Sequence, residues 1–245
     1  MTRADLGKDP DEVSSMFDGV ARRYDIVNDL LSLGQTRRWR KRAVAIIDPQ
    51  PGMKILDIAA GPGSSSEPLH LKGAEVIALD FSDGMLAQGR KSRPYLQFVK
   101  GDALKLPFDD SQFDVTTISF GIRNTNDYEA ALREARRVTK PGGRMVVVEF
   151  STPTNRIFRN IYMNYLMKFL PKIAAKTSSN PDAYLYLAES IRAWPDQKAF
   201  ASKMSANGWL SPTWTNLTGG VVAVDRKSTR LNSSHSSVSR MPSSA

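Results

Sequence analysis

Polar residues that could bind a nucleoside follow several short apolar segments of this chain, each segment having the length of a buried strand. They are Asp57 with Gly61-Pro62-Gly63, then Asp80, then Asp102-Ala103, and then Ser119. The carboxyl ends of parallel strands meet at one edge of a sheet, so we expect these groups to line one crevice. Carboxylates there can accept hydrogen bonds from hydroxyl or amine groups, and glycines let the backbone approach a ligand closely.

The acidic residues at these strand ends restrict the class of ligand that the crevice could bind. Asp80 can accept both hydroxyls of a ribose, which alone does not separate a nicotinamide dinucleotide from S-adenosylmethionine. Dinucleotide sites usually carry Gly-x-Gly-x-x-Gly, whereas position 66 is Ser. Asp57 would repel a pyrophosphate but could pair with an ammonium group, while Asp102 and the Ala103 N–H could bind adenine. The set favours a cationic ligand without phosphate; the alternative is that these acids only cap helices.

Strands and helices alternate through the middle of the chain, which is typical of a parallel sheet with helical crossovers. The predicted strands are 53–58, 75–80, 96–99, 113–119, 144–150, 209–216 and 220–224, and the helices between them are 64–72, 83–92, 127–139 and 195–207. We expect Ser82 to cap a helix, Lys140–Gly143 to form a tight turn, and Leu217–Gly220 to join the last two strands as an antiparallel hairpin. The predicted fold is α/β and Rossmann-like, with a mostly parallel seven-stranded sheet closed by that hairpin.

Three segments lie outside this alternation. Apolar spacing predicts helices at about 11–33 and 36–47, which form an N-terminal helical cap over 1–47. The main domain is 48–225 and contains an insertion at 151–194, which is rich in Tyr, Met and Leu and is broken by Pro171 and Pro181. That insertion is either a lid or pocket for an apolar substrate or ordinary core. Residues 226–245 are dense in serine and are predicted to be a disordered, non-native tail.

Composition excludes several kinds of chemistry. The 245 residues include no Cys and two His, so thiol catalysis, disulfides and a metal site are not expected. No apolar run is long enough to span a bilayer, and the N-terminus lacks an apolar signal core, so we expect a cytoplasmic protein. The net charge of +9 favours anionic partners. The basic helix around Trp39 is either a solvated face with Trp39 as its one anchor or a surface for anionic lipid or phosphate.

Several motifs together resemble class I S-adenosylmethionine-dependent methyltransferases, and more closely the ubiquinone/menaquinone-biosynthesis C-methyltransferase family, over about residues 11 to 225. The motifs are Met16-Phe-Asp-x-Val-Ala-x-x-Tyr-Asp25, Leu56-Asp57 with Gly61-x-Gly63, Leu104-x-Leu-Pro-Phe108, Ile118-Ser-Phe-Gly-Ile-Arg-Asn124, Lys140-Pro-Gly-Gly143 and Tyr184-x-Tyr-Leu-x-x-Ser190. One departure stands out, because the family usually has Thr where this chain has Pro62, which removes a hydroxyl and an N–H.

The resemblance implies S-adenosylmethionine as cofactor and methyl transfer to a ring carbon of a polyprenylated quinol, with demethylmenaquinol the leading substrate. A polyprenyl-benzoquinol or another small lipophilic aromatic stays open as an alternative. Arg123 is the candidate catalytic cation for an anionic quinol, unless it forms a salt bridge with an acid such as Asp25. Tyr24, Asn28 and Tyr162 are candidate substrate contacts.

A polyprenyl tail would keep this substrate in a bilayer, so we expect the basic face around Trp39 to make transient contact with the inner face of the membrane. A nicotinamide-dependent oxidoreductase is a rival interpretation of the site. A nucleic-acid-binding module has the charge in its favour but no recognisable nucleic-acid motif or aromatic platform, so no nucleic acid is expected.

Overall fold

The computed structural model describes residues 7–9, 12–13, 15–16, 32, 34–169 and 181–229. Most of the helix predicted at 11–33, with Tyr24 and Asn28, lies outside the described residues. So does Pro171 in the predicted insertion. The predicted helix at 36–47 is present as α3 (Gln35–Ile47).

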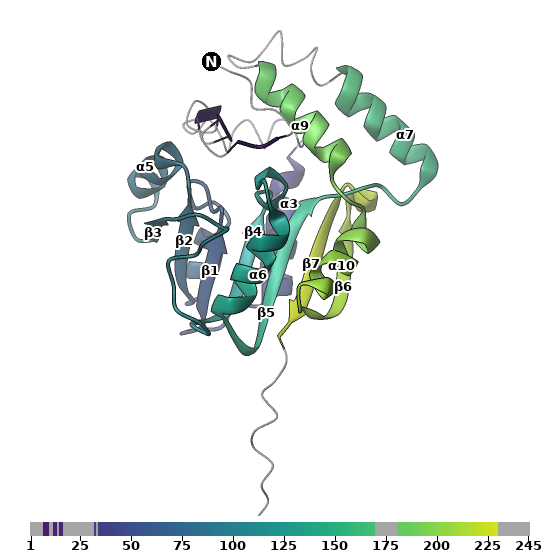
Figure 1. Ribbon diagram of the computed structural model, residues 1–245. Coiled ribbons are helices and arrows are strands. Elements are labelled where there is room, and N and C mark those ends of the chain that lie inside the picture. The colour runs from purple at the N-terminus through teal and green to yellow at the C-terminus, as the bar shows by residue number, and fades with distance from the viewer. Residues whose placement is uncertain are drawn as a thin grey trace, which may run out of the picture.

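Among the described residues, seven strands form one sheet in the order β3-β2-β1-β4-β5-β7-β6 (Figure 1). The strands are β1 (Lys54–Ile58), β2 (Glu75–Asp80), β3 (Gln97–Lys100), β4 (Phe113–Ser119), β5 (Thr139–Phe150), β6 (Leu210–Leu217) and β7 (Val222–Ser228). Neighbours from β3 to β5 are parallel, whereas β7 runs antiparallel to both β5 and β6. The predicted α/β sheet, with its closing hairpin, is confirmed.

Helices cover both faces of the sheet (Figure 1). They are α3, α4 (Glu67–His70), α5 (Asp83–Ser92), α6 (Tyr128–Val138) and α10 (Gln197–Ala206). Leu132 of α6 and Met204 of α10 share one apolar core with β1, and Trp39 of α3 packs into a second core with Val146 of β5. Ser82 caps α5 as predicted, because its hydroxyl accepts a hydrogen bond of 3.0 Å from the Met85 N–H.

Two predictions about local structure are wrong. Helix α4 spans only Glu67–His70, because residues 61–66 form turns at the ligand edge instead.

Lys140–Gly143 is not a separate tight turn but part of β5. Phe113 pairs with Thr139 and Val115 with Arg144, so the residues between Thr139 and Arg144 bulge out of the ladder. Gly142 allows this because its φ is +79°.

The last strand is longer than predicted. β7 continues to Ser228, whose partner is Arg144 of β5, and the Thr229 N–H donates to the Gly143 carbonyl at 2.9 Å. The predicted strand end at 224, and the start of a disordered tail at 226, are therefore wrong for residues 226–229. Backbone hydrogen bonds to β5 and β6 hold this polar segment, and hydropathy does not reveal them.

The insertion supplies helices that lie over the carboxyl edge of the sheet (Figure 1). They are α7 (Arg156–Asn164), the π-helical η3 (Tyr165–Phe169) and α9 (Pro181–Ala193). Asn155 begins α7 by accepting hydrogen bonds from the backbone N–H groups of Ile157 and Phe158. Leu166 of η3 packs against Tyr184 and Ala188 of α9. Within the part of the chain that the structure describes, no helix combines the length and apolarity needed to cross a membrane.

Candidate functional site

An acid-rimmed cavity of about 130 Å³ lies at the carboxyl ends of β1, β2 and β4. Asp80, Asp102, Ala103 and Gly61 line it, as the sequence predicted, and Lys8 from the N-terminal segment lines it too. The parallel strands bring these residues together although they are far apart in the chain.

Asp80 fixes the glycine turn that follows β1. Its Oδ2 accepts a hydrogen bond of 2.7 Å from the Gly61 N–H, and its Oδ1 accepts one of 2.9 Å from the Ser82 N–H. Asp102 orders its own loop in the same way, because its Oδ1 accepts from the Leu104 N–H at 2.8 Å. The carboxylates at this edge are therefore held in place by the backbone.

Asp57 is a buried carboxyl beneath the turn. Its Oδ2 accepts hydrogen bonds from the hydroxyls of Ser65 at 2.8 Å and Ser66 at 2.6 Å. Burial raises the pKa of Asp57 to about 6, although these two hydroxyls favour the charged form. Its Oδ1 is buried and has no hydrogen-bond partner among the described residues.

A second, larger cavity of about 550 Å³ adjoins the first. Its walls are mostly apolar and come from α3, the ends of β4 and β5, and the helices α7, η3 and α9. The rings of Trp39, Phe120 and Phe150 meet at its base, with Phe120 and Phe150 centroids 5.1 Å apart. This arrangement suits a flat aromatic ring with an apolar extension.

Arg123 lines the large cavity from the 3₁₀ turn η2 (Ile122–Asn124) that follows β4. Its Nη1 donates to Glu149 Oε1 at 2.8 Å and to the Phe120 carbonyl at 2.7 Å, and the guanidinium lies 5.1 Å from the Phe150 ring centroid. Burial raises the pKa of Glu149, and the Arg123 charge opposes that shift. The salt bridge that the sequence left open is therefore present, with Glu149 as the partner.

The two cavities meet at residues that both of them share. Ala59, Gly61 and Phe120 line each cavity. Ala59 and Phe120 have φ values of +53° and +57°, which L-residues with a side chain rarely adopt. Strained backbone of this kind is concentrated at functional sites, so the junction is a candidate functional position.

The other predicted residues differ in position. Pro62, Ser119 and Tyr162 line the large cavity, whereas Asp57 and Gly63 line neither cavity. Gly63 serves packing instead: its φ is +85°, and a Cβ there would lie 2.9 Å from the Phe98 ring. Burial raises the pKa of Tyr162, so its hydroxyl stays protonated and can donate a hydrogen bond.

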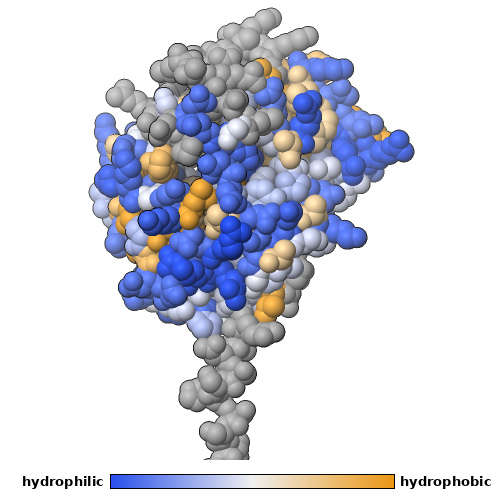
Figure 2. Space-filling view, viewed as in Figure 1, coloured by the Kyte–Doolittle hydropathy of each residue, from blue (hydrophilic) through white to orange (hydrophobic). Residues whose placement is uncertain are grey.

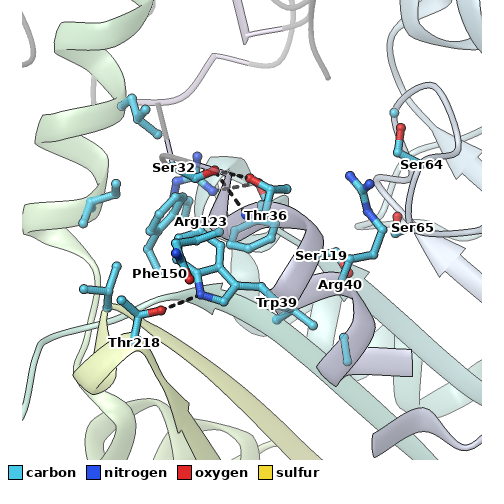
Figure 3. A pocket seen from close by; sticks show the side chains of 18 of the residues that line it. Ser32, Thr36, Trp39, Arg40, Ser64, Ser65, Ser119, Arg123, Phe150 and Thr218 are labelled. Atoms are coloured by element: carbon cyan, nitrogen blue, oxygen red, sulfur yellow. Dashed lines mark hydrogen bonds between the residues drawn. The ribbon is translucent and has the colours of Figure 1, made fainter. Parts of the chain in front are cut away.

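Of the two alternatives for α3, the structure has the solvated basic face with Trp39 as its anchor. Arg37, Arg38, Lys41 and Arg42 are exposed, whereas Trp39 is only 5% exposed and its Nε1 donates to Thr218 Oγ1 at 2.8 Å. Trp39 therefore cannot insert into a membrane. Arg40 was not singled out, yet it lines the large cavity and extends toward Ser65 beside the glycine turn (Figure 3). The spacing of Thr36, Trp39, Ala43 and Ile47, which are buried on one side of α3, was the available signal.

Comparison with known proteins agrees with this geometry. The model of the ubiE/COQ5 methyltransferase family matches residues 5–228, so the match ends where β7 ends. The demethylmenaquinone methyltransferase of Paenarthrobacter aurescens is 58% identical over 92% of this chain and 89% of that protein. The demethylmenaquinone methyltransferase of Streptomyces griseus is 56% identical over 92% of this chain and 98% of that protein.

A solved structure supports the fold alone. The S-adenosylmethionine-dependent methyltransferase of Thermotoga maritima is 20% identical, with a TM-score of 0.64 over 89% of this chain and all of that one. Because the family model spans nearly the whole chain and the relatives exceed half identity over nine-tenths of it, this chain belongs to the ubiE/COQ5 methyltransferase family.

Proposed function

We propose that this chain transfers a methyl group from S-adenosylmethionine to a ring carbon of demethylmenaquinol, a step in menaquinone biosynthesis. The observation that carries the proposal is the joining of an acid-rimmed cavity to a large apolar one, in a chain whose full-length relatives are named for this reaction. One cavity suits a cationic nucleoside and the other a flat ring with a long apolar tail.

The residues present fit S-adenosylmethionine. Asp57 lies beneath the glycine turn, so its negative charge would favour the ammonium of the amino-acid part without direct contact, through the Ser65 that it holds at the cavity wall. Asp80 and Asp102 would accept from the ribose and the adenine. Arg40 would bind the carboxylate, because it lines the large cavity and extends toward Ser65 beside the glycine turn (Figure 3). The cofactor supplies a methyl group that its positive sulfur has already activated.

Arg123 and the aromatic residues act on the quinol. A quinol becomes a carbon nucleophile when a ring hydroxyl gives its proton to water. The charge of the Arg123 guanidinium is paired with Glu149, but its Nε has no hydrogen-bond partner among the described residues and would donate to the resulting oxyanion. The hydrogen on the methylated ring carbon then leaves as a proton, which restores the quinol. Glu149 holds that guanidinium in place by a bond of 2.8 Å. Trp39, Phe120 and Phe150 hold the ring flat and exclude water, so alignment of the two reactants supplies much of the rate.

A methylation assay with reduced quinols tests this function. The full chain should add one methyl group to demethylmenaquinol and act more slowly on a polyprenyl-benzoquinol of equal tail length. S-adenosylhomocysteine should raise the melting temperature, whereas NADP should not. Asp80→Asn should weaken the binding of S-adenosylhomocysteine, while Asp83→Asn, which changes a side chain that is 72% exposed, should not.

Two results would contradict the proposed function. A faster reaction with the benzoquinol would reassign the substrate. Stabilisation by NADP without stabilisation by S-adenosylhomocysteine would exclude methyl transfer as the activity.

A further inference from the structure

Three large apolar side chains on the outer side of α7 and η3 are exposed to solvent. Ile157, Ile161 and Phe169 are 73%, 62% and 59% exposed. Residues four apart share one side of an α-helix, so Ile157 and Ile161 of α7 point the same way, and Phe169 is exposed at the end of the π-helical η3 that follows. We call these three residues the α7 ridge. Grouped exposed apolar residues mark an interaction surface more often than a solvated one.

The α7 ridge is continuous with the large cavity. The other side of the same helices, Phe158, Tyr162 and Leu166, lines that cavity, and Ile161 lines it while remaining mostly exposed. Ile161 therefore stands at the mouth. An apolar tail that leaves the cavity past Ile161 meets the ridge next.

Positive charge surrounds the ridge. Arg156, Arg159 and Lys168 are exposed, and the chain from Ser151 to Phe169 contains no Asp or Glu. None of the three cations forms an ion pair with a described residue. Most of the face seen in Figure 2 is instead hydrophilic, with hydrophobic residues in small separate groups. An exposed apolar ridge flanked by cations is the pattern of a helix that lies in an anionic bilayer surface.

We propose that the α7 ridge docks this protein on an anionic lipid bilayer, with Ile157, Ile161 and Phe169 in the boundary between headgroups and acyl chains. The inference rests on the proposed function, because a polyprenyl quinol keeps its tail in the bilayer and the ridge aligns the cavity mouth with that tail. It replaces α3 as the docking surface, since Trp39 of α3 is buried. Arg156 and Lys168 supply the attraction to anionic headgroups.

Vesicle flotation of the full chain tests the proposal. The protein should float with vesicles of equal parts phosphatidylcholine and phosphatidylglycerol, and far less with phosphatidylcholine alone. Ile157→Glu/Phe169→Glu should lower the bound fraction at least about tenfold. The matched control Leu71→Glu changes an equally exposed apolar residue, 73%, away from the ridge and should float like the wild type. Arg156→Gln/Lys168→Gln should lose about fivefold in affinity per removed charge, and only on anionic vesicles.

Two assays separate this inference from the proposed function. Ile157→Glu/Phe169→Glu should methylate a short-chain, water-soluble demethyl quinol at the wild-type rate, because neither residue lines a cavity. It should lose activity on the long-chain quinol in vesicles. Wild-type flotation by this variant, or no flotation by the wild type, overturns the docking surface. Absence of methylation on the short quinol by every form overturns the proposed function, and flotation still decides the ridge.

Discussion

A single carboxyl group shows how burial prepares this site for its ligand. Asp57 is fully buried, and two serine hydroxyls satisfy only its Oδ2. Burial raises its pKa, because a charged carboxylate is costly away from water. A positively charged group bound at the turn above Asp57 would favour its charged form.

The affinity for S-adenosylhomocysteine should therefore rise with pH. Burial raises the pKa of Asp57 from 3.8 to about 6, so its protonated form stabilises the fold at low pH and that contribution is lost as pH rises through 6. An ammonium group binds best when Asp57 is charged, so binding has the opposite pH dependence to folding. The affinity for S-adenosylhomocysteine should increase about tenfold between about pH 5 and pH 7. Calorimetric titration checks this. Asp57→Asn should bind weakly at every pH, and an unchanged pH slope in that variant would assign the titration to another group.

The role of the Arg123–Glu149 ion pair is tested by replacing both residues together. Removing Arg123 alone leaves Glu149 buried without its cation, which costs about 3–5 kcal/mol of folding free energy and obscures any effect on activity. Arg123→Met/Glu149→Met removes both charges and should fold. We expect kcat to fall about 100-fold or more, with the affinity for S-adenosylhomocysteine unchanged. Wild-type turnover by the double variant would make the pair purely structural.

At the scale of elements, α3 does more than cover the sheet. Its inner side places Trp39 on the wall of the large cavity and Arg40 beside the glycine turn, so under the proposed function one helix would contact both the quinol and the cofactor. The Trp39 hydrogen bond to Thr218 ties this helix to the β6–β7 hairpin. The charge pattern left a solvated face and a lipid surface open here, because a run of arginines does not reveal which of its members faces inward.

Arg40→Ala should discriminate between two ligands that share an adenosine part. Loss of a charge-assisted hydrogen bond to a carboxylate should weaken S-adenosylhomocysteine binding by about tenfold or more. Binding of 5′-methylthioadenosine, which lacks the amino-acid part, should not change. Arg40→Lys should restore part of the loss, and Lys41→Ala, an exposed neighbour, should have no effect. An equal loss for both ligands would make Arg40 a structural residue.

For the molecule as a whole, the sequence was sufficient to predict what depends on local pattern. Alternating apolar segments predicted the order of the strands and helices, and turn residues predicted the closing hairpin. Asp80, Asp102 and Ala103 were found because strand ends converge in a parallel sheet. Glu149 was missed as the partner of Arg123, since a pair separated by 26 residues depends on how β4 and β5 align. The aromatic base of the large cavity was missed for the same reason.

The position of β7 has a consequence for how this chain is made. β7 lies between β5 and β6, yet both of those strands precede it in sequence. During synthesis the edge of β5 stays unpaired while about seventy residues follow it, since β6 cannot reach the sheet without β7. An exposed strand edge invites pairing with other chains. Nascent chains that stop before Val222 are therefore the forms of this protein most exposed to aggregation and most dependent on chaperones.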